Sequence, residues 1–294
     1  MSKFLPSIIL MLCINTLFAS NLRQQLAEAI KGKDAKIGVA IIINGADTAT
    51  VGNERRYPLM SVMKFHQALT VANYLDKNHI PLNAKIAIKK EDLKENTYSP
   101  LRDKHPDGGI DLEISQLLNY TLQLSDNNAC DILFDYIGGT KAVNGYIHSL
   151  GIIDCQIHAT ENDMHRDISM CYENNSTPFA TALLAERFYS EDLFSRQYKE
   201  FIKTTMTECA TGKDRLPAGI PGSDAIIGHK TGTGDRDTNG RQIGCNDAGF
   251  VVLPDGSHYS IAVFITDSGE SDQENARIIA EISRIVYLYA TQKH

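Results

Sequence analysis

The residues best suited to chemistry in this sequence are Ser61 and Lys64, which stand three positions apart directly before an apolar-periodic run over 65–75. That run predicts a helix, and residues three apart share a helix face, so the hydroxyl and the amine could meet. Unpaired N–H groups in the first turn would add partial positive charge beside a serine nucleophile. The alternative is that Ser61 only caps the helix and Lys64 is a solvated surface charge.

The elements that must position these residues follow from apolar periodicity. A helix over 22–32 and a buried strand over 36–45 come first, and a helix over 273–290 comes last. The middle of the chain is mostly helical, with predicted helices over 62–75, 112–124, 126–139, 141–151, 178–190 and 194–208. Strands return late and predict an antiparallel meander, over 225–232, 247–256 and 258–268.

This order predicts that the two ends of the chain build one sheet while the middle forms a helical lobe. We expect an α/β (α+β) fold with two lobes, an antiparallel sheet flanked by helices plus an all-helical lobe. A cleft would separate them, with Ser61 on the helical side and Lys230 on the first late strand. The expected single catalytic domain covers 21–294, divided into an α/β lobe over 21–58 and 212–294 and a helical lobe over 59–211.

Residues 1–20 predict a cleaved export signal, because Lys3 precedes an apolar stretch that ends in two small residues. A retained membrane helix is the alternative, but Asn15 and Thr16 interrupt a stretch that is already short for a bilayer span. We expect a periplasmic or secreted protein with no stable membrane anchor.

The composition of the chain indicates which classes of binding partner to expect. A chain of 294 residues with 43% apolar residues can bury a sizeable core, and a net charge of -7 without a long basic run disfavours nucleic acid. Five cysteines follow residue 20 with no C-x-x-C pair, so at least one thiol should stay free. No paired histidine motif is present, so no metal or cofactor is expected. We expect a monomer that acts on a small molecule.

Further short stretches complete a constellation with Ser61 and Lys64: Ser125-Asp126-Asn127, Glu161 within T-E-N-D-M-H, and Lys230-Thr231-Gly232. Each alone is a weak signal, but together and in this order they resemble the signature of class A β-lactamases and penicillin-binding proteins. The whole chain after residue 20 is similar to a class A serine β-lactamase. Within that family it resembles the PER-type cephalosporinase branch, because Glu161 is followed four places later by His165.

The resemblance implies catalytic roles for Ser61, Lys64, Ser125 and Glu161. Ser61 would be acylated, with Lys64 or Glu161 acting through water as rival bases for that step. Glu161 would activate the water that releases the product, and Ser125 would pass a proton to the leaving nitrogen. The backbone N–H groups of Ser61 and Thr233 would form an oxyanion hole. The substrate-binding positions implied by the resemblance are Tyr98, Asn127, His165, Lys230, Thr231, Gly232 and Thr233.

Two alternatives concern single residues. Glu173 is a rival for the base, but it lies 48 positions after Ser125, whereas Glu161 lies 36 after it, and the shorter spacing fits the family. His165 could position the hydrolytic water or could simply pack in its loop. Asp126 is expected to be structural, satisfying backbone donors.

The chain also departs from the family. Many class A enzymes carry an arginine on the strand beside K-T-G, where this chain has C-N-D-A-G-F over 245–250. Arg236 and Arg241 are possible substitutes, neither of them favoured. The cysteine pair of carbapenem-hydrolysing members is absent, since Met60 and Gly234 occupy those places. The resemblance therefore implies cephalosporins and penicillins as substrates.

Two rival functions would use the same serine, lysine and K-T-G residues. One is that of a penicillin-binding peptidase, and the other is that of a β-lactam sensor that stays acylated. Glu161 argues against both, because rapid deacylation is the property that they lack.

Overall fold

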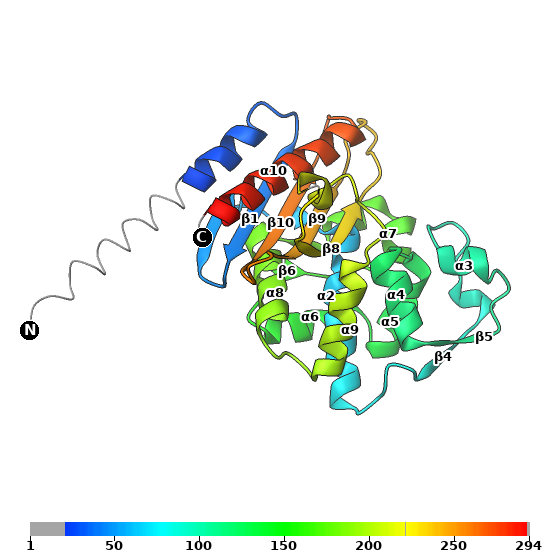
Figure 1. Cartoon of the computed structure of the whole chain (residues 1–294). Helices are drawn as coiled ribbons and strands as arrows, with labels where there is room; N and C mark the ends of the chain where they lie inside the picture. The colour runs from blue at the N-terminus through cyan, green and yellow to red at the C-terminus, as the bar shows by residue number, and fades with distance from the viewer. Residues whose placement is uncertain (1–20, 221, 293–294) are drawn as a thin grey trace, which may run out of the picture.

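A computed structural model describes residues 21–220 and 222–292 (Figure 1). Its main sheet has five antiparallel strands in the order β2-β1-β10-β9-β8. The first two strands come from the start of the chain and the other three from its end, which confirms the predicted fold class and the late meander. The strands are β1 (Lys36–Ile43), β2 (Asp47–Val51), β8 (Ile226–Thr233), β9 (Cys245–Val252) and β10 (His258–Thr266).

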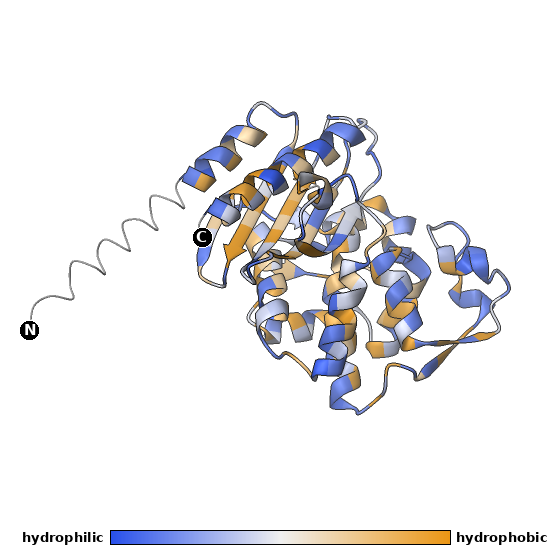
Figure 2. Cartoon of the chain, viewed as in Figure 1, coloured by the Kyte–Doolittle hydropathy of each residue, from blue (hydrophilic) through white to orange (hydrophobic). Residues whose placement is uncertain are grey.

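Both faces of the sheet are buried at β1 and β10, which explains why these two central strands are almost continuously apolar (Figure 2). Along β1, Val39 and Ile41 pack in a core with helix α10 (Asp272–Gln292), whereas Ala40 and Ile42 pack in a core with the helical part. The helix over residues 21–30 lies beside α10 on the first face (Figure 1). Helix α8 (Pro178–Ser190) packs on the opposite face.

Helix α2 (Met63–Lys77) forms the middle of the helical part, and most of its side chains are buried. The remaining helices of this part are α3 (Pro100–Lys104), α4 (Ile114–Gln123), α5 (Asn127–Ile137), α6 (Thr140–Ser149), α7 (Glu161–Arg166) and α9 (Arg196–Thr207). Short 3-10 turns complete the chain, namely η1 (Met60–Val62), η2 (Lys90–Asp92), η3 (Ile168–Tyr172) and η4 (Leu216–Gly219).

Short strands outside the main sheet are the main difference from the sequence prediction, because strands of two to four residues are too short for apolar periodicity to reveal. One of them shortens a predicted helix. The helix expected over 112–124 begins only at Ile114, because the preceding residues form a strand and Glu113 caps the helix in a box with Gln116. The short strands form two small sheets, β4 (Lys85–Ile88) with β5 (Ile110–Glu113), and β3 (Tyr57–Pro58) with β7 (Asn175–Ser176) and β6 (Cys155–Gln156).

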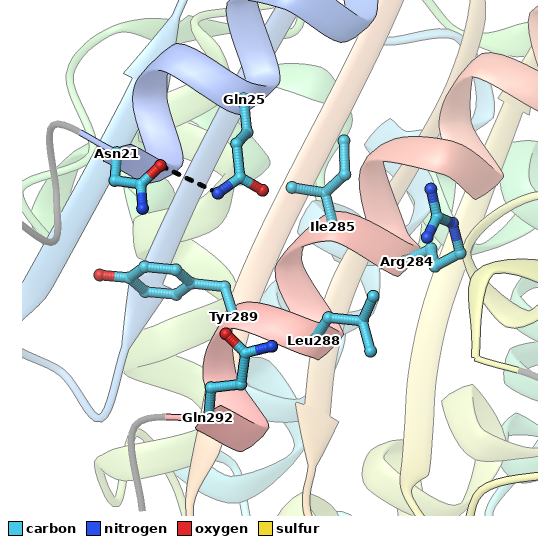
Figure 3. A pocket seen from close by; sticks show the side chains of 7 residues that line it. All are labelled: Asn21, Gln25, Arg284, Ile285, Leu288, Tyr289 and Gln292. Carbon is cyan, nitrogen blue, oxygen red and sulfur yellow. Dashed lines mark hydrogen bonds between the residues drawn. The ribbon is translucent and has the colours of Figure 1, made fainter.

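A shallow pocket of about 270 Å³ lies between the first helix and α10, where Asn21 and Gln25 face Ile285 and Tyr289 (Figure 3). None of the predicted site residues lines it. Within residues 21–220 and 222–292, no helix is both long and apolar enough to span a bilayer. The predicted export signal over 1–20 lies outside the described residues. All five cysteines after residue 20 are buried free thiols.

Candidate active site

The structure brings Ser61 and Lys64 together as predicted. Ser61 lies in the 3-10 turn that leads into α2, and the Lys64 Nζ donates to its Oγ at 3.1 Å. Lys64 has no exposed surface, and Ser61 occupies neither cap position, since Leu59 is the N-cap of η1 and Val62 is the N-cap of α2. The alternative of a capping serine and a solvated lysine is therefore wrong. The same ammonium reaches the Ser125 carbonyl at 2.7 Å, the Asn127 Oδ1 at 2.6 Å and the Glu161 Oε1 at 2.9 Å.

Glu161 is the first residue of the short helix α7. Thr160 caps that helix in a box with Asp163. The Glu161 Oε1 lies 3.5 Å from the Ser61 Oγ, and both side chains line one cleft. The rival base Glu173 is exposed and does not line this cleft.

Two polar side chains, the half-buried Asp131 and the fully buried Asn174, hold the segment that carries Glu161. Asp131 accepts from the backbone N–H groups of Glu161 and Asn162, each at 2.8 Å. Asn174 accepts from the N–H groups of His158 and Ala159 at 2.7 and 2.9 Å. Burial and then the charge of Glu161 raise the pKa of Asp131 to about 7. Sequence reasoning missed both residues, because each acts on a segment far along the chain.

Ser125 adopts a left-handed backbone with φ of 60°, a strained conformation for a non-glycine residue. The neighbouring Asp126 stabilises this turn, since it is fully buried and accepts from Ser99 Oγ, Leu101 N and Ala129 N. Asp126 is therefore structural, as the sequence indicated. The strain aims the Ser125 hydroxyl between the two lysines, with Lys64 Nζ at 3.4 Å and Lys230 Nζ at 2.9 Å.

Lys230 lies on β8, on the opposite side of the site from α2. It is fully buried and donates to Ser125 Oγ and to the Thr231 carbonyl, both at 2.9 Å. Burial lowers its pKa to about 8. Gly232 is required for close packing, because a Cβ there would lie 2.6 Å from the Leu59 carbonyl oxygen beside Ser61. The K-T-G strand and the serine turn are therefore in direct contact.

The cleft in front of these residues has a volume of about 530 Å³. Tyr98 stands at its rim with 59% of its surface exposed, and exposed His165 lines its α7 side. A second cavity, of about 260 Å³, lies on the K-T-G side and is lined by Ser125, Thr231 and Thr233 among others. All the predicted site residues thus border one region, with Tyr98 and His165 at its edge.

Comparison with known proteins agrees with this geometry. The family model described as "Beta-lactamase enzyme family" matches residues 21–290. A β-lactamase of Bacteroides uniformis is 40% identical, over 97% of each chain, and the extended-spectrum β-lactamase PER-1 of Pseudomonas aeruginosa is 31% identical, over 92% of this chain and 88% of its own. A crystal structure of a class A β-lactamase from Bacteroides cellulosilyticus superposes with a TM-score of 0.90 at 46% identity, covering 94% of this chain and 99% of its own.

The chain is a class A β-lactamase. It belongs to a family of serine hydrolases that open β-lactam rings, and its relatives include the PER-type branch suggested by Glu161 and His165.

Sequence reasoning also missed a residue of this β-lactamase beside the K-T-G strand. Arg215 donates to the carbonyl oxygens of Gly232 and Asn246 at 3.1 and 2.8 Å, and to the Thr233 Oγ1 at 2.6 Å. It lines the smaller cavity beside Thr231. Its guanidinium therefore places a positive charge at the K-T-G side of the cleft. In the sequence, Arg215 lies 15 residues before Lys230 and belongs to no recognisable motif, so nothing there marks it as a site residue.

The two arginines considered from the sequence face elsewhere in this β-lactamase. Arg236 pairs with Asp272 and Arg241 pairs with Asp34, and neither arginine lines the cleft or the smaller cavity. Each is committed to a surface ion pair, so the suggestion that either replaces the missing arginine is wrong.

Proposed function

We propose that this β-lactamase opens the β-lactam ring through a covalent ester on Ser61 and releases the product with a water activated by Glu161. The observation that carries the proposal is the position of the Ser61 Oγ, 3.1 Å from the Lys64 Nζ and 3.5 Å from the Glu161 Oε1. A hydroxyl within reach of an amine and a carboxylate, in a nearly dry site, has what nucleophilic catalysis requires.

In the acylation step the Ser61 Oγ attacks the ring carbonyl and its proton passes to the Lys64–Glu161 pair. The carbon–nitrogen bond of the ring then breaks, and the nitrogen takes a proton from the Ser125 hydroxyl, which regains one from Lys64, so that the Ser61 proton ends on the nitrogen. The backbone N–H groups of Ser61 and Thr233 stabilise the negative oxygen, and such donors are each worth about 3–4 kcal/mol.

In the deacylation step Glu161 takes a proton from a water that attacks the ester carbonyl, and Ser61 leaves with a proton. Asp131 and Asn174 favour this step by holding the Glu161 segment against the site. His165, at the edge of the cleft, is proposed to help position the water.

Substrate binding is proposed to use both sides of the cleft. Lys230, Thr231 and Arg215 provide positive charge and hydroxyl donors for the substrate carboxylate. Asn127 and the backbone of the Gly232–Thr233 strand hold the amide side chain, and Tyr98 covers the cleft mouth.

The expected substrates are cephalosporins and penicillins. Met60 and Gly234 occupy the places of the cysteine pair of carbapenem hydrolases, and a Cβ on Gly234 would contact the Met60 Cε at 3.1 Å. PER-1, a relative, is named an extended-spectrum enzyme. We expect kcat/KM for a cephalosporin to exceed that for a carbapenem, and equal values would refute this substrate range.

We propose that the enzyme acts as an exported monomer, since one chain supplies every residue of the site. Mass measurement of the protein from the periplasmic fraction, together with light scattering, tests both statements. A mass that retains residues 1–20 would contradict export by signal cleavage.

The central test is Glu161→Gln, which retains the size of the side chain but removes the base. We expect one equivalent of rapid ring opening, then very slow turnover, with the acyl-enzyme accumulating in the intact mass spectrum. The matched control is Glu173→Gln, which changes an exposed carboxylate and should turn over like the wild type. Rapid steady-state hydrolysis by Glu161→Gln would show that another group is the base. Ser61→Ala should form no adduct.

A further inference from the structure

The segment over 94–98 forms one wall of the cleft, shortly before helix α3. Most of its residues line the cleft, namely Glu95, Asn96, Thr97 and Tyr98. Its two ends are fixed by helix α5. The fully buried Asn128 accepts from the Lys94 N–H at 3.0 Å and donates to the Lys94 carbonyl at 3.1 Å. At the other end, the Asn127 N–H donates to the Tyr98 carbonyl at 3.0 Å.

The middle of this segment is held by one guanidinium. Arg102, on α3, donates through its Nη1 to three backbone carbonyls, those of Lys94 at 2.9 Å, Glu95 at 2.6 Å and Thr97 at 2.7 Å. No other described residue donates to the carbonyl of Glu95 or Thr97. Arg102 lines a separate cavity of about 270 Å³ and not the cleft, so it supports the wall without facing a substrate.

Thr97 connects this support to the catalytic groups. Its Oγ1 accepts from the Asn127 Nδ2 at 2.8 Å, while the Asn127 Oδ1 accepts from the Lys64 Nζ at 2.6 Å. Together these two bonds fix which end of the Asn127 amide faces Lys64. The Nδ2 carries two hydrogens, and Thr97 uses one of them. The second is available to a carbonyl of a substrate in the cleft, which Asn127 lines.

We propose that Arg102 is a positioning residue for substrate binding, which acts through Thr97 to orient the Asn127 amide toward the acylamino carbonyl of the substrate. The inference rests on the proposed function, in which Asn127 holds the amide side chain. Without the guanidinium, the Glu95 and Thr97 carbonyls lose their donor and turn toward water. The segment then relaxes, the Thr97 hydroxyl moves away from Asn127, and the amide loses its defined orientation.

The ion pair of Arg102 provides a matched control. The Arg102 Nη2 lies 2.7 Å from the Asp103 Oδ1, and the Asp103 side chain is 64% exposed, so this ion pair contributes little. Asp103→Asn removes the ion pair and retains the three carbonyl contacts of Arg102. Arg102→Met removes both, so the difference between the two variants reports the carbonyl contacts.

The first experiment compares substrates with and without the carbonyl that Asn127 would bind. Benzylpenicillin has an acylamino group, whereas 6-aminopenicillanic acid has the same ring system with a free amine in its place. Arg102→Met should raise the KM for benzylpenicillin about tenfold while kcat changes less, and should leave the KM for 6-aminopenicillanic acid within about twofold of the wild type. Asp103→Asn should match the wild type with both substrates. Equal losses for the two substrates would show a merely structural role and overturn the proposal.

The second experiment tests the path through Thr97, and it remains decisive if Arg102→Met folds poorly. Thr97→Val has the same shape but no acceptor for the Asn127 Nδ2, so it should raise the KM for benzylpenicillin about as much as Arg102→Met. Thr97→Ser retains the hydroxyl and should keep the wild-type KM. The double variant Arg102→Met/Thr97→Val should show no additional loss, because both changes act on the same chain of contacts. A wild-type KM for Thr97→Val, or fully additive losses, would contradict this path.

Failure of the proposed function gives a different result. A wild-type protein that hydrolyses neither penicillin would overturn the proposed function, and this inference with it. Normal hydrolysis by the wild type, with the same ratio of the two KM values in Arg102→Met, would overturn only the role of Arg102.

Discussion

The two sides of the cleft each bury a lysine completely, but they compensate its charge differently. Lys64, on the helical side, has the Glu161 carboxylate at 2.9 Å and the acceptors of Ser125 and Asn127 at 2.6–2.7 Å. Lys230, on the sheet side, contacts a hydroxyl and a carbonyl and forms no ion pair within the described residues.

This difference separates two chemical tasks. A lysine that is paired with a carboxylate beside a serine is suited to exchanging protons. A buried cation without a partner carboxylate keeps its charge available for the carboxylate of a substrate. Because burial destabilises the charged form, the pKa of Lys230 falls to about 8. The difference predicts that equivalent substitutions on the two sides will have opposite effects on stability.

The largest effect is expected for Lys64→Met. It removes a proton acceptor and leaves Glu161 buried without its partner, so kcat/KM should fall about 10²–10⁴-fold and stability by about 3–5 kcal/mol. Urea denaturation and cephalosporin kinetics measure the two effects. The double variant Lys64→Met/Glu161→Gln should recover much of the stability but no activity. A single variant as stable as the wild type would show that the ion pair does not matter.

Lys230→Met should reduce kcat/KM about 10–100-fold, mainly through KM, because it removes one charge-assisted hydrogen bond to the substrate. Its stability should equal or exceed that of the wild type, since no buried carboxylate loses its partner. A loss of stability as large as that of Lys64→Met would remove the distinction between the two sides.

Arg215→Ala should raise the KM about tenfold, because one charged donor beside Thr231 is lost. Arg236→Ala is the control, since that side chain pairs with Asp272 away from the cleft, and its KM should not change. Equal effects of the two variants would remove Arg215 from the carboxylate-binding group.

The smallest effect concerns pH. Burial lowers the pKa of Lys230 to about 8 from 10.5, so the unfolded chain binds more protons between these values. The contribution of Lys230 to stability therefore rises as pH rises through that window, while carboxylate binding declines above about pH 8. Urea denaturation of wild type and Lys230→Met at several pH values isolates the contribution. A stability difference that does not change with pH would contradict the shift.

Much of this protein could be predicted from the sequence because the relevant signals are local. Strong periodicity identified the long helices and four of the five strands in the main sheet, and their order along the chain implied that its ends pair. The residues of S-x-x-K, S-D-N and K-T-G were recognised as short patterns at helix starts and on a strand, and the fold brings them together.

The rest was decided by contacts between segments that are distant in the sequence. Whether Lys64 is solvated or buried depends on Ser125 and Glu161, which lie 61 and 97 positions further along the chain. Arg215 reaches Thr233 on β8 only through tertiary folding, and the sequence pointed instead to Arg236 and Arg241, which form surface ion pairs. Burial and charge compensation depend on three-dimensional packing, so they could be known only from the tertiary structure.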